Sequence, residues 1–275
     1  VPFHAWLPDA HSCAPTPVSA VLSGIFIKAL GIYALIRIFF NIFTVSGNLL
    51  FMLMLLGTVS MVVGAVLAIA QNDIKRMFAY SSISQIGYII FALGIGTPLG
   101  ILGGLFHLFN HAIFTSLLFL NAGSIERSTG TRDLRKLGGL NTKLPLTGYT
   151  GLAASMSISG IPPFAGFFSK LIIIIAALQA NHPGFAFVAA LVSIITLAYY
   201  LKFQTFAFFG KLHAGLDKLK PTPFTMKLPL VILAVICVFG GLLLIICFKP
   251  FLQSAVNALM AGTGYKDMVF GAMRS

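Results

Sequence analysis

Two histidines stand four residues apart in the apolar stretch GGLFHLFNHAIFTSLLFL, which covers residues 103–120. On a helix, His107 and His111 would share one face. A neutral imidazole accepts a proton at one nitrogen and donates one at the other near physiological pH, so such a pair can relay protons. No Glu or Cys stands nearby to complete a set of metal ligands, and we expect no metal site. The pattern favours a proton relay, and two hydrogen-bonded packing histidines are the alternative.

Two lysines also occupy apolar runs. Lys28 lies near the middle of a run over residues 17–43. Its stem reaches about 6 Å, whereas either end of the run is about 16 Å away along a helix, so the ammonium group cannot reach water by snorkelling. It is expected to face a polar interior, and a lysine held against carbonyl groups for packing is the alternative. Lys202 stands about seven residues from the end of its own run and is either a proton exit group or a snorkelling side chain.

The stretch SISGIPPFAGFFSK, residues 157–170, must interrupt a helix. It contains four helix-breaking residues: Gly160, Pro162, Pro163 and Gly166. Adjacent prolines remove two N–H donors and leave carbonyl groups that only neighbouring groups or water can satisfy. Broken helices of this kind mark ion and substrate sites in transporters, and a plain proline kink is the alternative. Lys170 follows the break directly, where an ammonium group could exchange its proton.

Composition places the chain in a membrane. Of its 275 residues, 58% are hydrophobic and only 9% are charged, against roughly a quarter charged in soluble domains. The apolar runs approach the roughly 20 residues of a spanning helix rather than the ~10 alternating residues of a barrel strand. We therefore expect an all-α, polytopic membrane helical bundle. The three cysteines are too scattered for a redox or metal site, no nucleotide or flavin motif is present, and we expect no cofactor.

The apolar runs predict about seven transmembrane helices, one of them broken by the prolines. They are expected at residues 17–43, 49–70, 79–96, 101–123, 144–178, 184–209 and 227–248. Residues 17–248 would form the bundle, and none of the six carboxylates falls within these spans. Residues 249–275 are less apolar and are expected to be an interfacial or flexible tail.

The positively charged residues are concentrated in some of the connections between these spans. Lys and Arg outnumber Asp and Glu by 18 to 6, and the net charge is +12. In a soluble protein this would suggest nucleic acid, but here it is explained by membrane topology, and no nucleic-acid partner is expected. The connections at residues 71–78, 124–143 and 210–227 are basic and alternate with neutral ones. The positive-inside rule places the basic loops and residues 1–16 in the cytoplasm and the chain in the cytoplasmic, or inner, membrane.

Five stretches together carry a family resemblance: PFHAWLPDAHSCAPTPVSAVLSG, QNDIKRMFAYSSISQIGY, FHLFNHAIFTSLLFL, GTRDLRKLGGL and SISGIPPFAGFFSK. They resemble the antiporter-like membrane subunits shared by respiratory complex I, Mrp-type cation/proton antiporters and membrane-bound NiFe hydrogenases. The resemblance runs from Val1 to about Gly210 and is closest to the hydrogenase and Mrp types. It implies two inverted five-helix repeats, of which this chain resembles the second. Residues 1–16 would then follow an upstream broken helix.

The resemblance also implies roles for the buried residues. Lys28 matches the family's central-axis lysine, His107 and His111 match the histidines of the connecting helix, and Lys170 matches the terminal station toward the outside. Some members carry a lysine where this chain has Thr115.

The function implied is translocation of protons, or of Na+ exchanged for protons, driven by redox chemistry elsewhere in a complex. The alternatives are a proton-pumping component of the complex I type, a non-conducting structural spacer, and a stand-alone antiporter. The implied partners are membrane lipid, other antiporter-like and small membrane subunits, and a peripheral iron–sulfur, NiFe or NADH-oxidising arm. The chain itself holds no redox site, so whether it belongs to an enzyme stays open.

Overall fold

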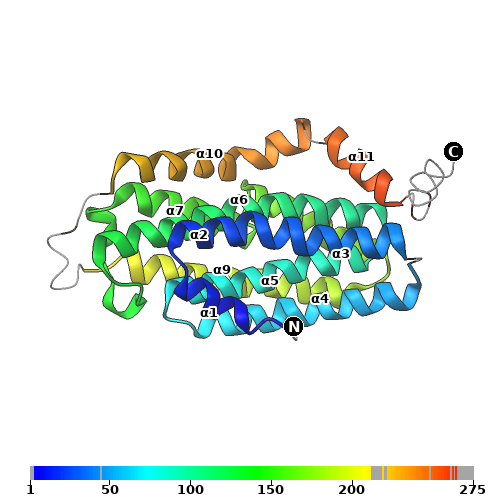
Figure 1. Ribbon diagram of the computed structural model, residues 1–275, viewed down its shortest axis with the longest axis horizontal. Helices are drawn as coiled ribbons and strands as arrows, with labels where there is room; N and C mark the ends of the chain where they lie inside the picture. The colour runs from blue at the N-terminus through cyan, green and yellow to red at the C-terminus, as the bar shows by residue number, and fades with distance from the viewer. Residues whose placement is uncertain are drawn as a thin grey trace.

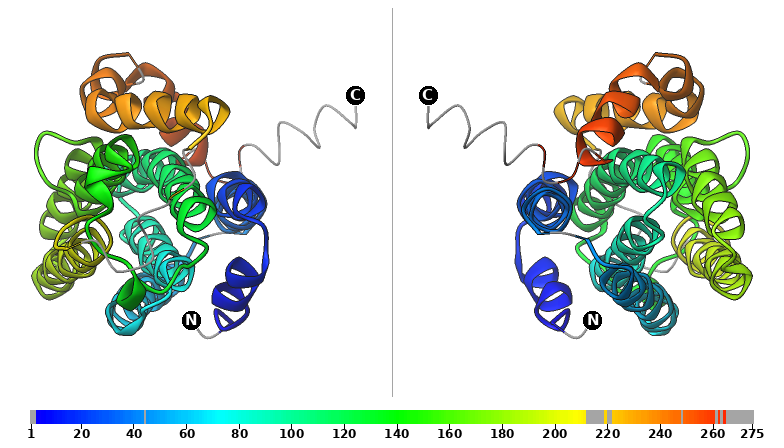
Figure 2. Two further views of the ribbon diagram at one scale, coloured as in Figure 1. Left: turned by 90° about the vertical axis from the view of Figure 1, so that its left-hand side faces the viewer. Right: turned by 90° about the vertical axis from the view of Figure 1, so that its right-hand side faces the viewer.

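The computed structural model describes residues 3–43, 45–211, 219, 222–247, 249–260, 262 and 264, with only the backbone at 29, 242–247 and 249. Every regular element in these residues is a helix. The helices lie side by side along the long axis, and α10 and α11 run along one side of the bundle (Figures 1 and 2). The prediction of an all-α membrane bundle is confirmed.

The helices follow one another through short connections. A first long helix covers residues 16–42 and is divided into α2 (Thr16–Val21), the π-helical η1 (Leu22–Ile32), α3 (Tyr33–Arg37) and the π-helical η2 (Ile38–Ile42). The short helix α1 (Trp6–Cys13) precedes it. The others are α4 (Gly47–Ala70), α5 (Ile74–Gly94), α6 (Pro98–Thr129), α7 (Pro145–Ser159), α8 (Ala165–Gln179), α9 (Pro183–Phe208), α10 (Phe224–Cys247) and α11 (Lys249–Met260). Two 3-10 turns, η3 (Leu134–Lys136) and η4 (Leu140–Thr142), lie between α6 and α7.

Among the described residues, six helices are long and apolar enough to cross a membrane, by length and composition. The seventh expected span is the broken one, since α7 ends at Ser159 and α8 begins at Ala165, with both prolines in the gap. Gly160 ends α7 in the left-handed conformation, with φ of 82°, which favours glycine. The prediction of about seven spans with one proline-broken helix is confirmed.

The hairpin of α4 and α5 is packed backbone against backbone. A Cβ atom added at Gly57 would lie 2.7 Å from Cα of Phe91, and one added at Gly87 would lie 2.7 Å from the Gly57 carbonyl oxygen. Gly64 and Gly94 meet backbone atoms of the facing helix in the same way. Small residues let membrane helices approach this closely, and van der Waals contact then stabilises the pair.

Two predicted boundaries are wrong. The basic connection expected at residues 71–78 is mostly helical, because α5 begins at Ile74, where the Asp73 side chain accepts a hydrogen bond from the Arg76 N–H and caps the helix. Likewise, α6 continues to Thr129 instead of ending near residue 123. Glu126 is therefore inside a spanning helix, contrary to the expectation that no carboxylate is.

The segment predicted as an interfacial or flexible tail begins with a helix. Residues 249–260 form α11, and its buried Leu252, Val256 and Leu259 pack in one cluster with Ile32 and Ile36 of the first long helix. The rest of the predicted tail, apart from residues 262 and 264, lies outside the described residues.

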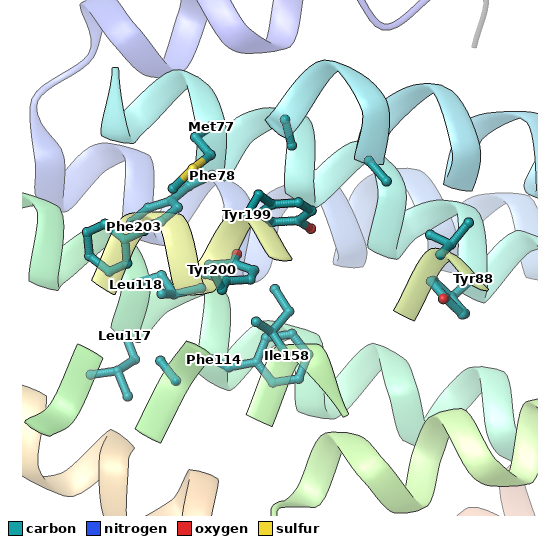
Figure 3. Close-up of a cluster of buried hydrophobic side chains, with 14 of the residues drawn as sticks. Met77, Phe78, Tyr88, Phe114, Leu117, Leu118, Ile158, Tyr199, Tyr200 and Phe203 are labelled. Atoms are coloured by element: carbon teal, nitrogen blue, oxygen red, sulfur yellow. The ribbon is translucent and has the colours of Figure 1, made fainter. Parts of the chain in front are cut away.

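A second and larger cluster fills the centre of the bundle. Tyr199 and Tyr200 of α9 lie beside Phe78 of α5, and Tyr88 lies further along the bundle (Figure 3). The polar groups of the candidate site border this apolar packing.

Candidate functional site

The histidine pair stands on α6, fully buried. The ring centroids of His107 and His111 lie 6.3 Å apart with an angle of 7° between the ring planes, so the rings are stacked. His107 Nδ1 is 2.9 Å from Ser169 Oγ on α8. The expected shared helix face is therefore present, and it is turned into the bundle toward the helix that follows the proline break.

Several polar atoms at this place have no hydrogen-bond partner in the described residues. They are His107 Nε2, both ring nitrogens of His111, Lys170 Nζ and Thr115 Oγ1. Buried polar groups are almost always hydrogen-bonded, to protein or to ordered water. His107, His111 and Thr115 stand four residues apart, so their side chains share one face of α6, and Lys170 of α8 belongs to the same group of unpartnered atoms.

Lys170 lies in the second turn of α8 and is 3% exposed. Its Nζ is 4.7 Å from the centroid of the Tyr88 ring, and that ring is 5.7 Å from the His107 ring, centroid to centroid. A cation over an aromatic face is stabilised by the ring quadrupole. A Cβ at Gly160 would stand 3.0 Å from Cδ of Lys170, so the glycine that ends α7 also makes room for the lysine stem.

The helix break is held by α6 and by its own serine. Asn110 Nδ2 of α6 donates to the Ala165 carbonyl at 3.1 Å, and the Ser169 hydroxyl donates to the Gly166 carbonyl at 3.0 Å. The free carbonyls of a broken helix need such partners at membrane depth. The break thus fixes Ser169, the hydrogen-bond partner of His107.

Lys28 is 4% exposed and lies in η1, where its ammonium group donates to the Ser23 carbonyl of its own helix. The first long helix packs on α6, with Ser116 donating to the Ala20 carbonyl at 3.3 Å. η1, which carries Lys28, is in contact with α6, which carries both histidines. The structure therefore brings the predicted Lys28, histidine pair and Lys170 into one buried region.

Lys202 makes different contacts. Its Nζ donates to the carbonyls of Ile69 and Gln71 at 2.9 and 2.8 Å, at the C-terminal end of α4. A cation there complements the last carbonyls and the negative end of the helix dipole. These contacts favour a capping side chain over a member of the histidine–lysine cluster.

A buried ion pair was not predicted from the sequence. Lys75 Nζ of α5 lies 3.0 Å from Glu126 Oε2 of α6, and the Lys75 side chain is 3% exposed. Both residues fall in predicted basic loops because their neighbours in sequence are charged. The signals that could have found them are Asp73, a typical N-cap, and Gly130, a typical glycine at a helix end, because they extend both helices past the pair.

Comparison with known proteins agrees with the fold and the motifs. The family described as "NADH:quinone oxidoreductase/Mrp antiporter, TM" matches residues 1–196. The chain is 36% identical over 270 residues to a component of a probable K(+)/H(+) antiporter of Rhizobium meliloti (strain 1021), covering 95% of this chain and 27% of that protein. It is also 36% identical over 248 residues to a component of the NADH-quinone oxidoreductase of Desulforudis audaxviator (strain MP104C), covering 87% of this chain and 49% of that protein.

A solved structure has the same fold. In the Mrp complex from Dietzia sp. DQ12-45-1b, one chain superposes with a TM-score of 0.85 and 29% identity, over 96% of this chain and 56% of that one. The chain thus spans from about a quarter to somewhat over half of these relatives. The resemblance inferred from the motifs is confirmed: this multi-pass membrane chain belongs to the NADH:quinone oxidoreductase/Mrp antiporter transmembrane family.

Proposed function

We propose that the chain is a proton-translocating, antiporter-like part of a membrane complex and that protons pass through Lys28, His107, His111 and Lys170. The observation that carries this is the burial of these four residues, with His107 Nε2, both ring nitrogens of His111 and Lys170 Nζ lacking hydrogen-bond partners among the described residues. Imidazole and amine groups linked by water form a path along which protons can hop.

The groups of this region favour protons over Na+ as the ion that moves here. Na+ is a hard cation and binds oxygen ligands, whereas these four side chains offer only nitrogens that are basic or already cationic. Exchange for Na+ would then take place elsewhere in a longer protein or complex. The same 36% identity to components of an antiporter and of a quinone oxidoreductase supports a shared proton-moving core.

The proposal extends to partners by analogy. The Dietzia chain is part of an Mrp complex, which supports association of this chain with other antiporter-like and small membrane subunits in lipid. A peripheral iron–sulfur, NiFe or NADH-oxidising arm would supply the driving force in a redox-driven complex.

We also propose that the end of the bundle carrying the basic connections faces the cytoplasm. The Ile74 N–H donates to the Arg132 carbonyl at 3.1 Å, and the Gly139 N–H donates to the Phe209 carbonyl at 3.0 Å, so all three basic segments begin at one end. Positive charge is retained on the cytoplasmic side of inner membranes.

Cysteine labelling of intact cells tests the orientation. Lys136 is exposed in η3, whereas the native Cys13 is also exposed and must be replaced by Ser first. In that background, Lys136→Cys should react with a membrane-impermeant maleimide only after the cells are permeabilised. Labelling from outside intact cells would invert the proposed orientation.

Proton flux tests the function itself. The intact complex is reconstituted in proteoliposomes with a pH-sensitive dye, and uncoupler gives the baseline. His107→Phe and His111→Phe keep ring volume but remove both nitrogens, so each should slow flux and the double variant should stop it. A stable double variant with normal flux would leave the chain as a non-conducting spacer.

A further inference from the structure

An ion-pair network connects α1, α5 and α6 where these helices meet. Lys75, in addition to its 3.0 Å pair with Glu126, donates to the Ala14 carbonyl at 3.2 Å, just after α1. The Thr16 hydroxyl donates to Glu126 Oε2 at 3.3 Å, and Arg132 Nε lies 3.6 Å from Glu126 Oε1. One carboxylate therefore joins three segments that are far apart in the sequence.

The two partners of the central pair differ in access. The Glu126 side chain is 36% exposed, whereas the Lys75 side chain is 3% exposed. Glu126 also borders a cavity of about 470 Å³ between α2, α6 and α10, with Thr16, Leu120 and Met226 in its walls. Glu126 is therefore the member of the pair that a proton entering from this cavity meets first.

His11 of α1 is a third buried titratable residue near the Glu126–Lys75 ion pair. It is fully buried, and neither ring nitrogen has a hydrogen-bond partner among the described residues. Its ring stacks on Phe119 of α6 with centroids 4.6 Å apart. The Ser19 hydroxyl of the first long helix donates to the His11 carbonyl at 3.2 Å, and Lys75 holds the Ala14 carbonyl three residues after His11. These contacts place His11 beside both the ion pair and the helix that carries Lys28. Burial, and then the charges of Lys28 and Lys75, lower the pKa of His11 to about 4.

We propose that Glu126, Lys75 and His11 form a proton-uptake path that delivers protons to Lys28. This inference rests on the proposed function, because it supplies the first station of the proton path. It adds three residues to that path, all nearer the basic end of the bundle than the histidines of α6 are.

Each step moves one proton and no electrons. A hydronium ion protonates Glu126, which weakens the ion pair and frees the Lys75 ammonium group. Lys75 passes a proton through water to His11 and recovers one from Glu126. His11 then gives its proton to neutral Lys28. The charged His11 is transient, because burial and the nearby lysine charges favour its neutral form.

The groups around Glu126 favour a proton over a metal cation. Both carboxylate oxygens already face cations, Lys75 on one side and Arg132 on the other. Arg127 lines the same cavity and adds a further positive charge. A Na+ or K+ ion would find neither free oxygens nor a negative field there.

A purely structural ion pair is the competing explanation, since Lys75 and Arg132 also hold carbonyls at the end of α1. His11 separates the two explanations. A structural role needs its ring, which packs on Phe119, but not its nitrogens, which bind nothing in the described residues.

The experiment is therefore His11→Phe in the intact reconstituted complex, with His182→Phe as the matched control. His182 is half-buried before α9, at the opposite end of the bundle, and has an edge-on contact with Phe185. We expect His11→Phe to reduce proton flux about 100-fold, as loss of a proton-transfer group does, with an unchanged thermal midpoint. The control should pump normally.

The outcomes separate this inference from the proposed function. Normal flux in His11→Phe, with flux stopped in the His107→Phe/His111→Phe double variant, overturns the uptake path and leaves the function standing. Normal flux in both overturns both.

Glu126→Gln decides the matter if His11→Phe does not assemble. The amide oxygen still accepts hydrogen bonds from Lys75 and Thr16 but cannot take up a proton. The uptake path predicts loss of flux in an assembled complex, and wild-type flux there overturns it.

Discussion

Two buried polar clusters of this bundle are built differently. In the hydroxyl cluster, Ser81 of α5 lies 2.8 Å from the Tyr199 hydroxyl and 2.9 Å from the Tyr200 hydroxyl, so all three groups satisfy one another. In the histidine–lysine cluster, four nitrogens have no hydrogen-bond partner among the described residues: His107 Nε2, both ring nitrogens of His111, and Lys170 Nζ. Both clusters are equally hidden from solvent.

We expect this difference to separate residues that matter for stability from residues that matter for proton flux. A buried polar group without a partner costs about 1–3 kcal/mol, so a cluster that serves only packing is expected to close on itself, as the hydroxyl cluster does. Groups that must gain and lose protons cannot be locked into fixed hydrogen bonds. We therefore expect substitutions in the histidine–lysine cluster to reduce proton flux. We expect substitutions in the hydroxyl cluster to reduce stability.

The largest effect is expected for Lys170. Lys170→Ala should reduce proton flux about 100-fold or more while the complex still assembles, because a transfer group is removed. Lys170→Arg is the matched variant: it keeps the charge but does not release its proton, so it should also block. Wild-type pumping by Lys170→Ala proteoliposomes would reduce this lysine to a structural role.

A stability effect without a flux effect is expected for Ser81. Ser81→Ala leaves the Tyr200 hydroxyl without its partner and should lower the free energy of unfolding by about 1–3 kcal/mol. Ser254→Ala, at an exposed serine bonded only within its own helix, serves as the control. Thermal denaturation is measured beside flux, and a block of flux in a folded Ser81→Ala complex would erase the distinction between the two clusters.

Substitution of Lys202 tests whether this lysine belongs to the histidine–lysine cluster. If it caps α4, Lys202→Met should cost about 1 kcal/mol of stability and leave flux unchanged, because the stem still packs while the charge at the helix end is lost. If it is an exit group, flux falls instead. Measuring both quantities on one preparation decides between the two roles.

The smallest effect is expected at the exposed loop pair of Asp133 and Arg135. A hydrogen bond from Arg135 lowers the pKa of Asp133 from its ordinary value of 3.8 to about 2. A lowered pKa in the folded state stabilises above the ordinary value, and this stabilisation is lost as the pH falls toward 2. Arg135→Ala should therefore lower the thermal midpoint slightly at pH 6 and much less at pH 2, where about half of Asp133 is protonated. An equal loss at both pH values would assign the effect to packing.

The sequence was sufficient for the architecture because its signals are strong and local. Long apolar runs and two adjacent prolines predict both the bundle and the place where α7 gives way to α8. Lys28 and Lys170 could be identified because a charge deep in an apolar run needs a polar interior.

The missed residues needed information from two helices at once. Lys75 of α5 and Glu126 of α6 neutralise each other's charge in the folded protein. A hydropathy profile considers one segment of sequence at a time, so it assigns each of these charged residues to a loop. His11 was missed because α1 is too short to be a span, and its burial depends on Phe119, more than a hundred residues away. The packing of α11 on the first long helix was missed for the same reason.

The glycine contacts of the α4–α5 hairpin have a mechanical consequence. Side chains can change rotamer and so let packed helices slide, but at Gly57 and Gly87 the contact is made by backbone atoms, which have no rotamers to change. The hairpin is thus a fixed frame within the bundle. We expect any shift within the bundle to be absorbed by elements outside this frame, and the break between α7 and α8, just before the helix that carries Lys170, is the expected hinge.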